Sequence, residues 1–190
     1  MVTGEQAAAR PLRADAQRNH ERLVEAARAA FAERGSEVAT EEIARAAGVG
    51  VGTLYRRFPR RIDLVEAVYR EDVDALVATA DSAPGDDPWA ALVAWLQGFV
   101  RYAHAKRAFL TELHEAFEKS PDLAVSSREK IRAAAGAVLG RAQDAGVARP
   151  DIDAAELMQL VGGMCMARGA TLEQNERLLT FVLDGVRARA

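Results

Sequence analysis

The hydrophobic positions of this chain recur at the spacing of α-helices from end to end. Apolar residues return every three or four positions, and no segment alternates between apolar and polar residues with the β-branched enrichment of a strand. Alanine, the best helix former, is frequent throughout the chain. The pattern therefore predicts an all-α protein.

The N-terminal third divides into one long helix and two short ones. The first helix is expected from about residue 16, ends at Gly35, and carries an apolar stripe formed by Leu23, Ala27, Ala30 and Phe31. A short helix is expected from an N-cap at Thr40 to Gly48. Another covers residues 51–57, because Pro59 disfavours helical geometry in the residue before it.

The remaining sequence predicts longer helices separated by clear breaks. A helix over residues 60–80 is followed by a candidate linker at residues 81–87. Asp87–Pro88 and Ser120–Pro121 each pair a favoured N-cap with proline at the first helical position. Asp153–Glu156 has the spacing of a capping box. The last two helices are apolar on more than one face, so burial on more than one side is expected.

Charge is distributed unevenly along the chain. The formal net charge is −3, yet residues 1–70 carry 12 arginines against 10 acids and residues 71–190 carry the acidic excess. The two segments are therefore expected to face different partners. The single cysteine, Cys165, excludes an internal disulfide, and we find neither a signal peptide nor a membrane-spanning run, so a soluble cytoplasmic protein is expected.

The two short helices and the glycine turn between them form a helix-turn-helix, whose second helix can enter a DNA major groove. Residues 53–61 read TLYRRFPRR, with four arginines and no acid. Arginine pairs with phosphates and guanine edges, and hydroxyl groups bind phosphate oxygens. The alternative is a solvated basic turn, or a helical protein-interaction module that uses this turn to bind acidic partners.

Residues 18–70 resemble the DNA-binding domain of the TetR family of transcriptional regulators. The matching residues are Ala26, Ala27, Phe31, Gly35, Thr40, Ile43, Ala44, Ala47, Gly48, Val49, Gly52, Thr53, Leu54, Tyr55, Phe58 and Leu64. The resemblance implies operator DNA as partner, with contacts from Thr53, Tyr55 and Arg56, and with Thr40 capping its helix near a phosphate. Arg57 stands where the family usually has histidine or tyrosine, and we count it among the contacts.

Two further departures from the family pattern concern Arg61 and Gly50. Arg61 replaces the usual lysine and keeps the positive charge, so a phosphate contact is expected there. Gly50 replaces serine or threonine and supplies no side-chain oxygen. N-terminal to the helix-turn-helix we expect a disordered tail. The alternative is an arm that enters the minor groove with Arg10, Arg13 and Arg18.

The C-terminal segment resembles the family in outline, which implies a homodimer through the last two helices and a small-molecule effector. Gly162 and Gly163 would permit close helix approach in such an interface. The alternative for each candidate pocket residue is ordinary core packing; the candidates are Trp95, Phe99, Tyr102, Phe109, Leu113, Phe117 and Met164. His104 and His114 lie too far apart to suggest a metal site.

The expected organisation is a disordered tail over residues 1–15, a helix-turn-helix domain over residues 16–62, and a helical ligand-binding and dimerisation domain over residues 63–190. We find no nucleophile elbow, phosphate loop or dinucleotide fingerprint, so an enzyme is not expected, and no cofactor or metal is needed. The function expected is that of a repressor that a small molecule releases from operator DNA.

Overall fold

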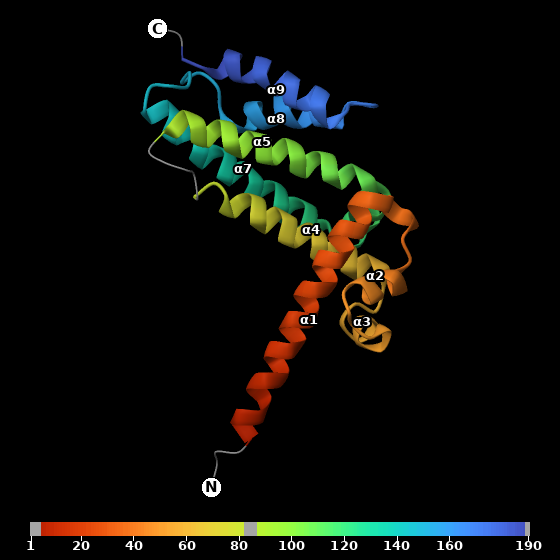
Figure 1. Ribbon diagram of the computed structural model, residues 1–190. Coiled ribbons are helices and arrows are strands. Elements are labelled where there is room, and N and C mark those ends of the chain that lie inside the picture. The colour runs from red at the N-terminus through yellow and green to blue at the C-terminus, as the bar shows by residue number, and fades with distance from the viewer. Residues whose placement is uncertain (1–4, 82–86, 189–190) are drawn as a thin grey trace. The chain divides into compact units, whose positions relative to one another are not determined.

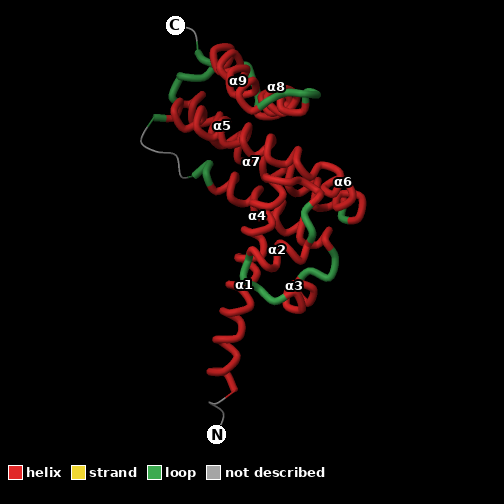
Figure 2. Tube along the Cα trace, turned by 45° about the vertical axis from the view of Figure 1, so that its right-hand side comes forward, coloured by secondary structure: helices red, strands yellow, loops and turns green. Residues whose placement is uncertain are grey.

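A computed structural model describes residues 5–81 and 87–188, with the backbone alone for residues 5–13 and 36. Across this part of the chain the regular elements are helices, joined by short loops (Figure 2). The β-type contact found there is one isolated bridge between Ala148 and Arg187. The all-α prediction is confirmed.

The chain forms two compact units. The N-terminal unit contains Met1–Tyr69 and Ala108–Lys119, and the C-terminal unit contains Arg70–Arg107 and Ser120–Ala190. The helix-turn-helix lies wholly in the N-terminal unit, and the last two helices lie wholly in the C-terminal unit.

Helices α1 (Glu5–Arg34), α2 (Thr40–Ala46) and α3 (Val51–Arg57) open the N-terminal unit, which also holds the first half of α4 (Arg61–Ala78) and all of α6 (Leu110–Lys119). In Figure 1, α2 and α3 lie near the C-terminal half of α1. The fully buried core side chains of this unit include Leu23, Val24, Phe31, Ile43, Leu54 and Leu64. The predicted apolar stripe of α1 thus faces this core.

Two expectations about the N-terminal unit are wrong. Helix α1 begins at Glu5, so residues 5–15 are helical rather than a disordered tail, in keeping with the helix-favouring alanines at positions 7–9. Residues 1–4 and the side chains of Arg10 and Arg13 lie outside the described residues, while Arg18 pairs with Asp15. The N-cap of α2 is Ala39 rather than Thr40, which is the first helical residue.

Gly35 and Gly48 end their helices as predicted. Their φ angles are +59° and +63°, in the left-handed region that glycine adopts without steric cost. Helix α3 begins and ends where the sequence predicts, with Gly50 as an N-cap that has no side chain.

Helix α6 packs in the N-terminal unit, although the expected domain boundary placed it in the C-terminal domain. The ring centroids of Phe117 on α6 and Tyr69 are 5.2 Å apart, and those of Phe109, the residue just before α6, and Phe31 are 5.4 Å apart. The α6 residue Lys119 also pairs with Asp63 at 3.0 Å. These contacts between distant parts of the sequence have no signature in local periodicity.

The C-terminal unit is built on α5 (Pro88–Lys106), α7 (Pro121–Asp144), α8 (Ala154–Met166) and α9 (Leu172–Val186). Helix α5 contacts the other three, and α8 also contacts α7 and α9 (Figure 1). Within residues 5–81 and 87–188, no helix combines the length and apolar character that a membrane crossing requires.

The predicted helix starts of the C-terminal unit are confirmed, with one difference at a cap. The Asp87 carboxylate accepts hydrogen bonds from the backbone N–H of Trp89 and of Ala90. Asp153 and Glu156 form both halves of the capping box. Ser120 occupies the N-cap of α7, but its side chain makes no capping hydrogen bond.

Candidate nucleic-acid interface

Helix α3 has one face buried in the N-terminal unit and one face in solvent. Leu54 is fully buried and Phe58 is 5% exposed, so these residues anchor α3 to the core. The turn before α3 is fixed by Val49, whose N–H donates to the Ala44 carbonyl at 3.0 Å. The solvent face presents the first and second turns of α3 outward, with Val51, Gly52, Tyr55, Arg56 and Arg57 exposed.

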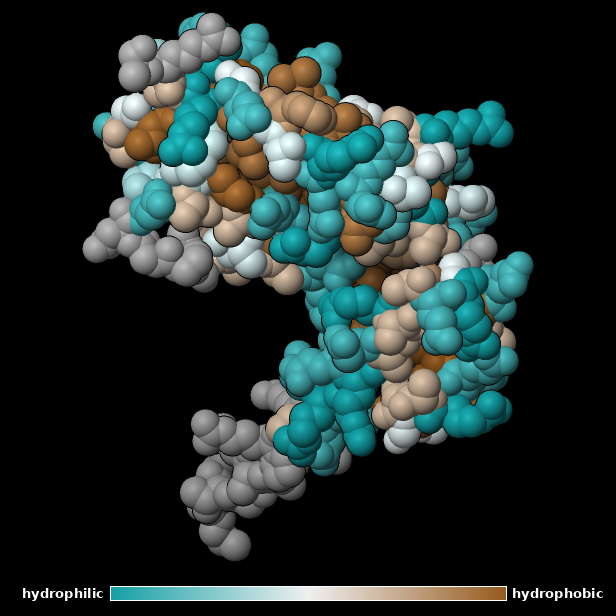
Figure 3. All heavy atoms as spheres, turned by 45° about the horizontal axis from the view of Figure 1, so that its top comes forward, coloured by the Kyte–Doolittle hydropathy of each residue, from teal (hydrophilic) through white to brown (hydrophobic). Residues whose placement is uncertain are grey.

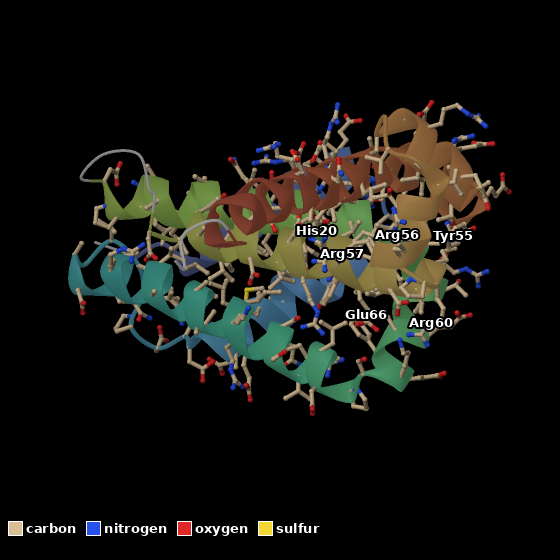
Figure 4. The ribbon with its side chains drawn as sticks, turned by 90° about the horizontal axis from the view of Figure 1, so that it is seen from below. His20, Tyr55, Arg56, Arg57, Arg60 and Glu66 are labelled. Carbon is tan, nitrogen blue, oxygen red and sulfur yellow. The ribbon has the colours of Figure 1, made fainter. Side chains whose placement is uncertain are left out.

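Arg56 and Arg57 are both exposed, and each makes a hydrogen bond to a side chain other than a carboxylate. Arg56 Nη2 donates to Thr53 Oγ1 at 3.0 Å, and Thr53 itself is half-buried. Arg57 Nε donates to Nδ1 of His20 on α1 at 3.1 Å, and the two side chains point toward one another in Figure 4. The Arg57 guanidinium also lies 6.0 Å from the centre of the Phe58 ring.

Arg60 is held by an acid. Its guanidinium pairs with the Asp63 carboxylate, which also accepts the Arg60 backbone N–H at 3.0 Å. Arg60, with a further contribution from Lys119, lowers the pKa of Asp63 to about 2. Asp63 therefore stays ionised near neutral pH and compensates the Arg60 charge.

Arg61 is directed into the N-terminal unit. Its guanidinium donates to the Val38 carbonyl, lies 3.4 Å from the Glu112 carboxylate, and sits 5.0 Å from the centre of the Phe31 ring. Its side chain is only 26% exposed. Arg61 thus joins the start of α4 to α1 and α6, and these contacts differ from the expected phosphate contact.

The four arginines of residues 53–61 therefore fall into two pairs. Arg60 and Arg61 have carboxylate partners within the N-terminal unit. Arg56 and Arg57 have no acidic partner among the described residues. The positive charge left uncompensated lies on the last turn of α3.

Tyr55 is 40% exposed and is held by an acid on α2. Its hydroxyl donates to Glu41 Oε1 at 2.5 Å. This hydrogen bond raises the pKa of Tyr55 and lowers the pKa of Glu41 from their usual values. The ring is thereby fixed on the solvent face of α3. The predicted contact residue Thr40 is half-buried and lies one residue before Glu41.

Sequence reasoning missed the partners that orient these side chains. His20 lies 37 residues before Arg57, and Glu112 lies 51 residues after Arg61. Neither pair has a sequence signal, because both depend on how helices pack. The Glu41–Tyr55 pair also crosses from one helix to the next.

The structure divides the predicted pocket residues between the two units. Phe109, Leu113 and Phe117 belong to the N-terminal unit, where Phe109 and Phe117 pack against Phe31 and Tyr69. The others belong to the C-terminal unit and are Trp95, Phe99, Tyr102 and Met164. Cavities of about 250 Å³ and 460 Å³ adjoin Arg149 and Asp151, and none of the seven candidates lines them.

The outer faces of α8 and α9 expose large apolar side chains. Leu160 is 54% exposed, Met166 57% and Phe181 65%. Figure 3 shows apolar side chains, in brown, gathered on the surface of the C-terminal unit. A Cβ atom added at Gly162 or Gly163 would meet no atom within 4 Å, so packing within the chain does not require these glycines.

Comparison with known proteins agrees with this division of the chain. Residues 23–68 match the family model described as bacterial regulatory proteins, tetR family. Residues 87–188 match the model of the SbtR-like transcriptional regulator C-terminal domain. The two models together span the helix-turn-helix and the α5–α9 segment.

Solved structures similar to this chain include two TetR regulators. TetR transcriptional regulator SCO0520 of Streptomyces coelicolor is 37% identical, with a TM-score of 0.79 over 90% of this chain and 99% of that one. A TetR regulatory protein of Mycobacterium vanbaalenii is 36% identical, with a TM-score of 0.72 over 94% of this chain and 100% of that one.

Among curated proteins, HTH-type transcriptional regulator SAUSA300_2515 of Staphylococcus aureus is 39% identical over 67 residues. That match covers 35% of this chain and 36% of the relative's length. Members of the matched family are DNA-binding regulators rather than enzymes. The full-length structural matches and the two family models show that this chain belongs to the TetR family of transcriptional regulators.

Proposed function

We propose that this regulator is a repressor that binds operator DNA through the solvent face of α3 and leaves it when a small molecule binds. The observation that carries the proposal is the pair Arg56 and Arg57, whose charges have no acidic partner among the described residues. Exposed arginine on the second helix of a helix-turn-helix is suited to phosphate and guanine contacts.

The contact residues proposed are Thr53, Tyr55, Arg56 and Arg57, with Thr40 near a phosphate. Arg61 acts by holding α4 against α1 and α6, since its hydrogen bonds are made to Val38 and Glu112. The operator contacts therefore come from α3 and the start of α2, and not from the start of α4.

Binding as a homodimer is supported by the exposed apolar face of α8 and α9. Leu160 and Phe181 would be buried against a second copy of this chain, and the glycines of α8 would allow close approach. We expect Phe181→Glu, combined with Leu160→Glu, to give a monomer in analytical ultracentrifugation. The matched control is Val125→Glu on α7, where an exposed valine outside α8 and α9 receives the same charge, and this variant is expected to remain a dimer. An unaltered dimer in the double variant would contradict this interface.

An effector site is proposed in the C-terminal unit, where Trp95, Phe99, Tyr102 and Met164 remain candidates. Release requires that the ligand bind the DNA-free conformation more tightly than the DNA-bound one. A compound that stabilises the protein against heat and dissociates it from DNA supports the site. A compound that stabilises the protein but leaves DNA affinity unchanged at saturation is not the releasing ligand.

Selection from a random DNA pool tests the DNA-binding proposal. Sequencing of the recovered DNA is expected to give two half-sites related by a dyad, since two recognition helices of a dimer read successive major grooves. Binding should weaken with salt yet keep its preference for the selected sequence. A protein-interaction module with a basic turn would lose binding to all sequences together. In a reporter assay, repression is expected, and increased transcription would reveal an activator.

A further inference from the structure

Two exposed apolar side chains lie one helical turn apart on the solvent face of α3. Val51 is 42% exposed and Tyr55 is 40% exposed. The opposite face of α3 is already anchored by Leu54, which is fully buried. Neither Val51 nor the ring of Tyr55 is therefore required to hold α3 on the N-terminal unit.

Gly52 has no side chain, so the helix backbone is accessible between Val51 and Tyr55. A Cβ atom there would meet nothing within 4 Å, and Gly52 does not have a positive φ. Neither packing nor backbone conformation calls for glycine at this position, and glycine weakens a helix relative to alanine. Close approach of a binding partner to the backbone of α3 would be a physical reason for glycine at position 52.

The ring of Tyr55, rather than its hydroxyl, is the part available to DNA. The hydroxyl proton is donated to Glu41 Oε1 at 2.5 Å, so this proton is not offered to a phosphate while the pair is intact. A phosphate oxygen would also be repelled by the Glu41 carboxylate beside it. Tyr55 and Val51 thus present carbon surface to a partner of α3.

The major groove offers one apolar group, the C5-methyl of thymine, which apolar side chains recognise by direct contact. Resting on the proposed operator binding, we infer that Val51 and the Tyr55 ring contact thymine methyl groups in each half-site, and that Gly52 lets α3 approach the base edges. Val51 is then a specificity-determining residue, and Glu41 is a positioning residue for Tyr55.

The test uses the full chain and the operator duplex recovered by selection, with each thymine replaced in turn by deoxyuridine, which lacks only the methyl group. Burying one methyl contributes about 0.8 kcal/mol, so wild-type affinity should fall about fourfold at the contacted thymines. Val51→Ala changes both copies in the dimer, so it should bind the unmodified operator more weakly by about fourfold for each half-site, and become insensitive to deoxyuridine at one of those positions in each half-site. The control Val125→Ala, at a valine 52% exposed on α7, should behave as wild type.

Tyr55→Phe keeps the ring and removes the hydroxyl. It should bind within about twofold of wild type, whereas Tyr55→Ala should lose the methyl contact as well. The inference would be overturned if deoxyuridine lowered the affinity of wild type and of Val51→Ala equally at every thymine. It would also be overturned if deoxyuridine lowered the wild-type affinity at no thymine. In both cases sequence-specific binding would still stand. Failure to recover any preferred sequence would instead overturn the proposed operator binding and the inference with it.

Discussion

Arg57 Nε donates a hydrogen bond to His20 Nδ1 across 3.1 Å and thereby ties the last residue of α3 to α1. The His20 ring also lies against the Phe58 ring, with centroids 5.4 Å apart. Helix α1 thus helps to fix the direction of a side chain proposed to contact DNA.

Replacement of His20 should weaken DNA binding through Arg57. We expect His20→Ala to reduce operator affinity about threefold, since an unpositioned arginine loses part of a charge-assisted hydrogen bond. In the Arg57→Ala background the same replacement should have little further effect. Fluorescence anisotropy of all four proteins gives this double-mutant cycle. Additive losses would show that His20 acts independently of Arg57.

Arginines without a carboxylate partner should dominate the salt dependence of DNA binding. Arg56→Ala should lower the slope of log K against log salt by about 0.9 for each phosphate that Arg56 neutralises, and a dimer carries two copies of Arg56. Arg60→Ala should change it less, because the Arg60 charge is already compensated by Asp63. Anisotropy titrations at several salt concentrations measure both slopes. A larger change for Arg60→Ala than for Arg56→Ala would reverse the proposed assignment.

Arg61 should matter for stability rather than for contact with DNA. Arg61→Ala removes a hydrogen bond to Val38 and leaves the Glu112 carboxylate, whose side chain is 13% exposed, without this partner. The free energy of unfolding should fall by about 1–3 kcal/mol. Adding Glu112→Gln should recover part of the loss, and Arg56→Ala is the matched control with unchanged stability. Urea unfolding measures each variant, and an unchanged midpoint for Arg61→Ala would argue against the structural role.

Asp63 should make the N-terminal unit more stable near neutral pH than in acid. Its folded pKa of about 2 lies below the usual 3.8, so its contribution is present above pH 3.8 and is lost as the pH falls toward 2. Asp63→Asn should therefore lower the free energy of unfolding by about 1 kcal/mol at neutral pH, after allowance for solvent screening. The difference from wild type should shrink below about pH 4. A difference that is constant with pH would exclude ionisation of Asp63 as its cause.

The elements near the helix-turn-helix were predictable because their signals are local. Gly35 and Gly48 adopt the left-handed conformation expected at helix ends, and Pro59 stops α3 at the expected residue. The capping box at Asp153 and Glu156 is likewise confirmed, since both of its hydrogen bonds join residues three positions apart.

Side-chain roles that depend on packing were not predictable in the same way. Arg60 and Arg61 are adjacent in a basic run but have different partners. Arg60 pairs with Asp63, whereas Arg61 donates to the Val38 carbonyl and pairs with Glu112. The sequence pattern treats all four arginines alike because it contains no information about which helices meet. The membership of α6 in the N-terminal unit was missed for the same reason, since Phe117 and Tyr69 meet only after folding.

The central claim is that the solvent face of α3 binds a specific DNA sequence through Arg56 and Arg57. Its most direct measurement is sequencing of DNA recovered from a random pool by the wild type and by the folded double variant Arg56→Ala, Arg57→Ala. A palindromic sequence enriched by the wild type and lost with the double variant is the expected result. Equal enrichment of the same sequence by both proteins would contradict the claim.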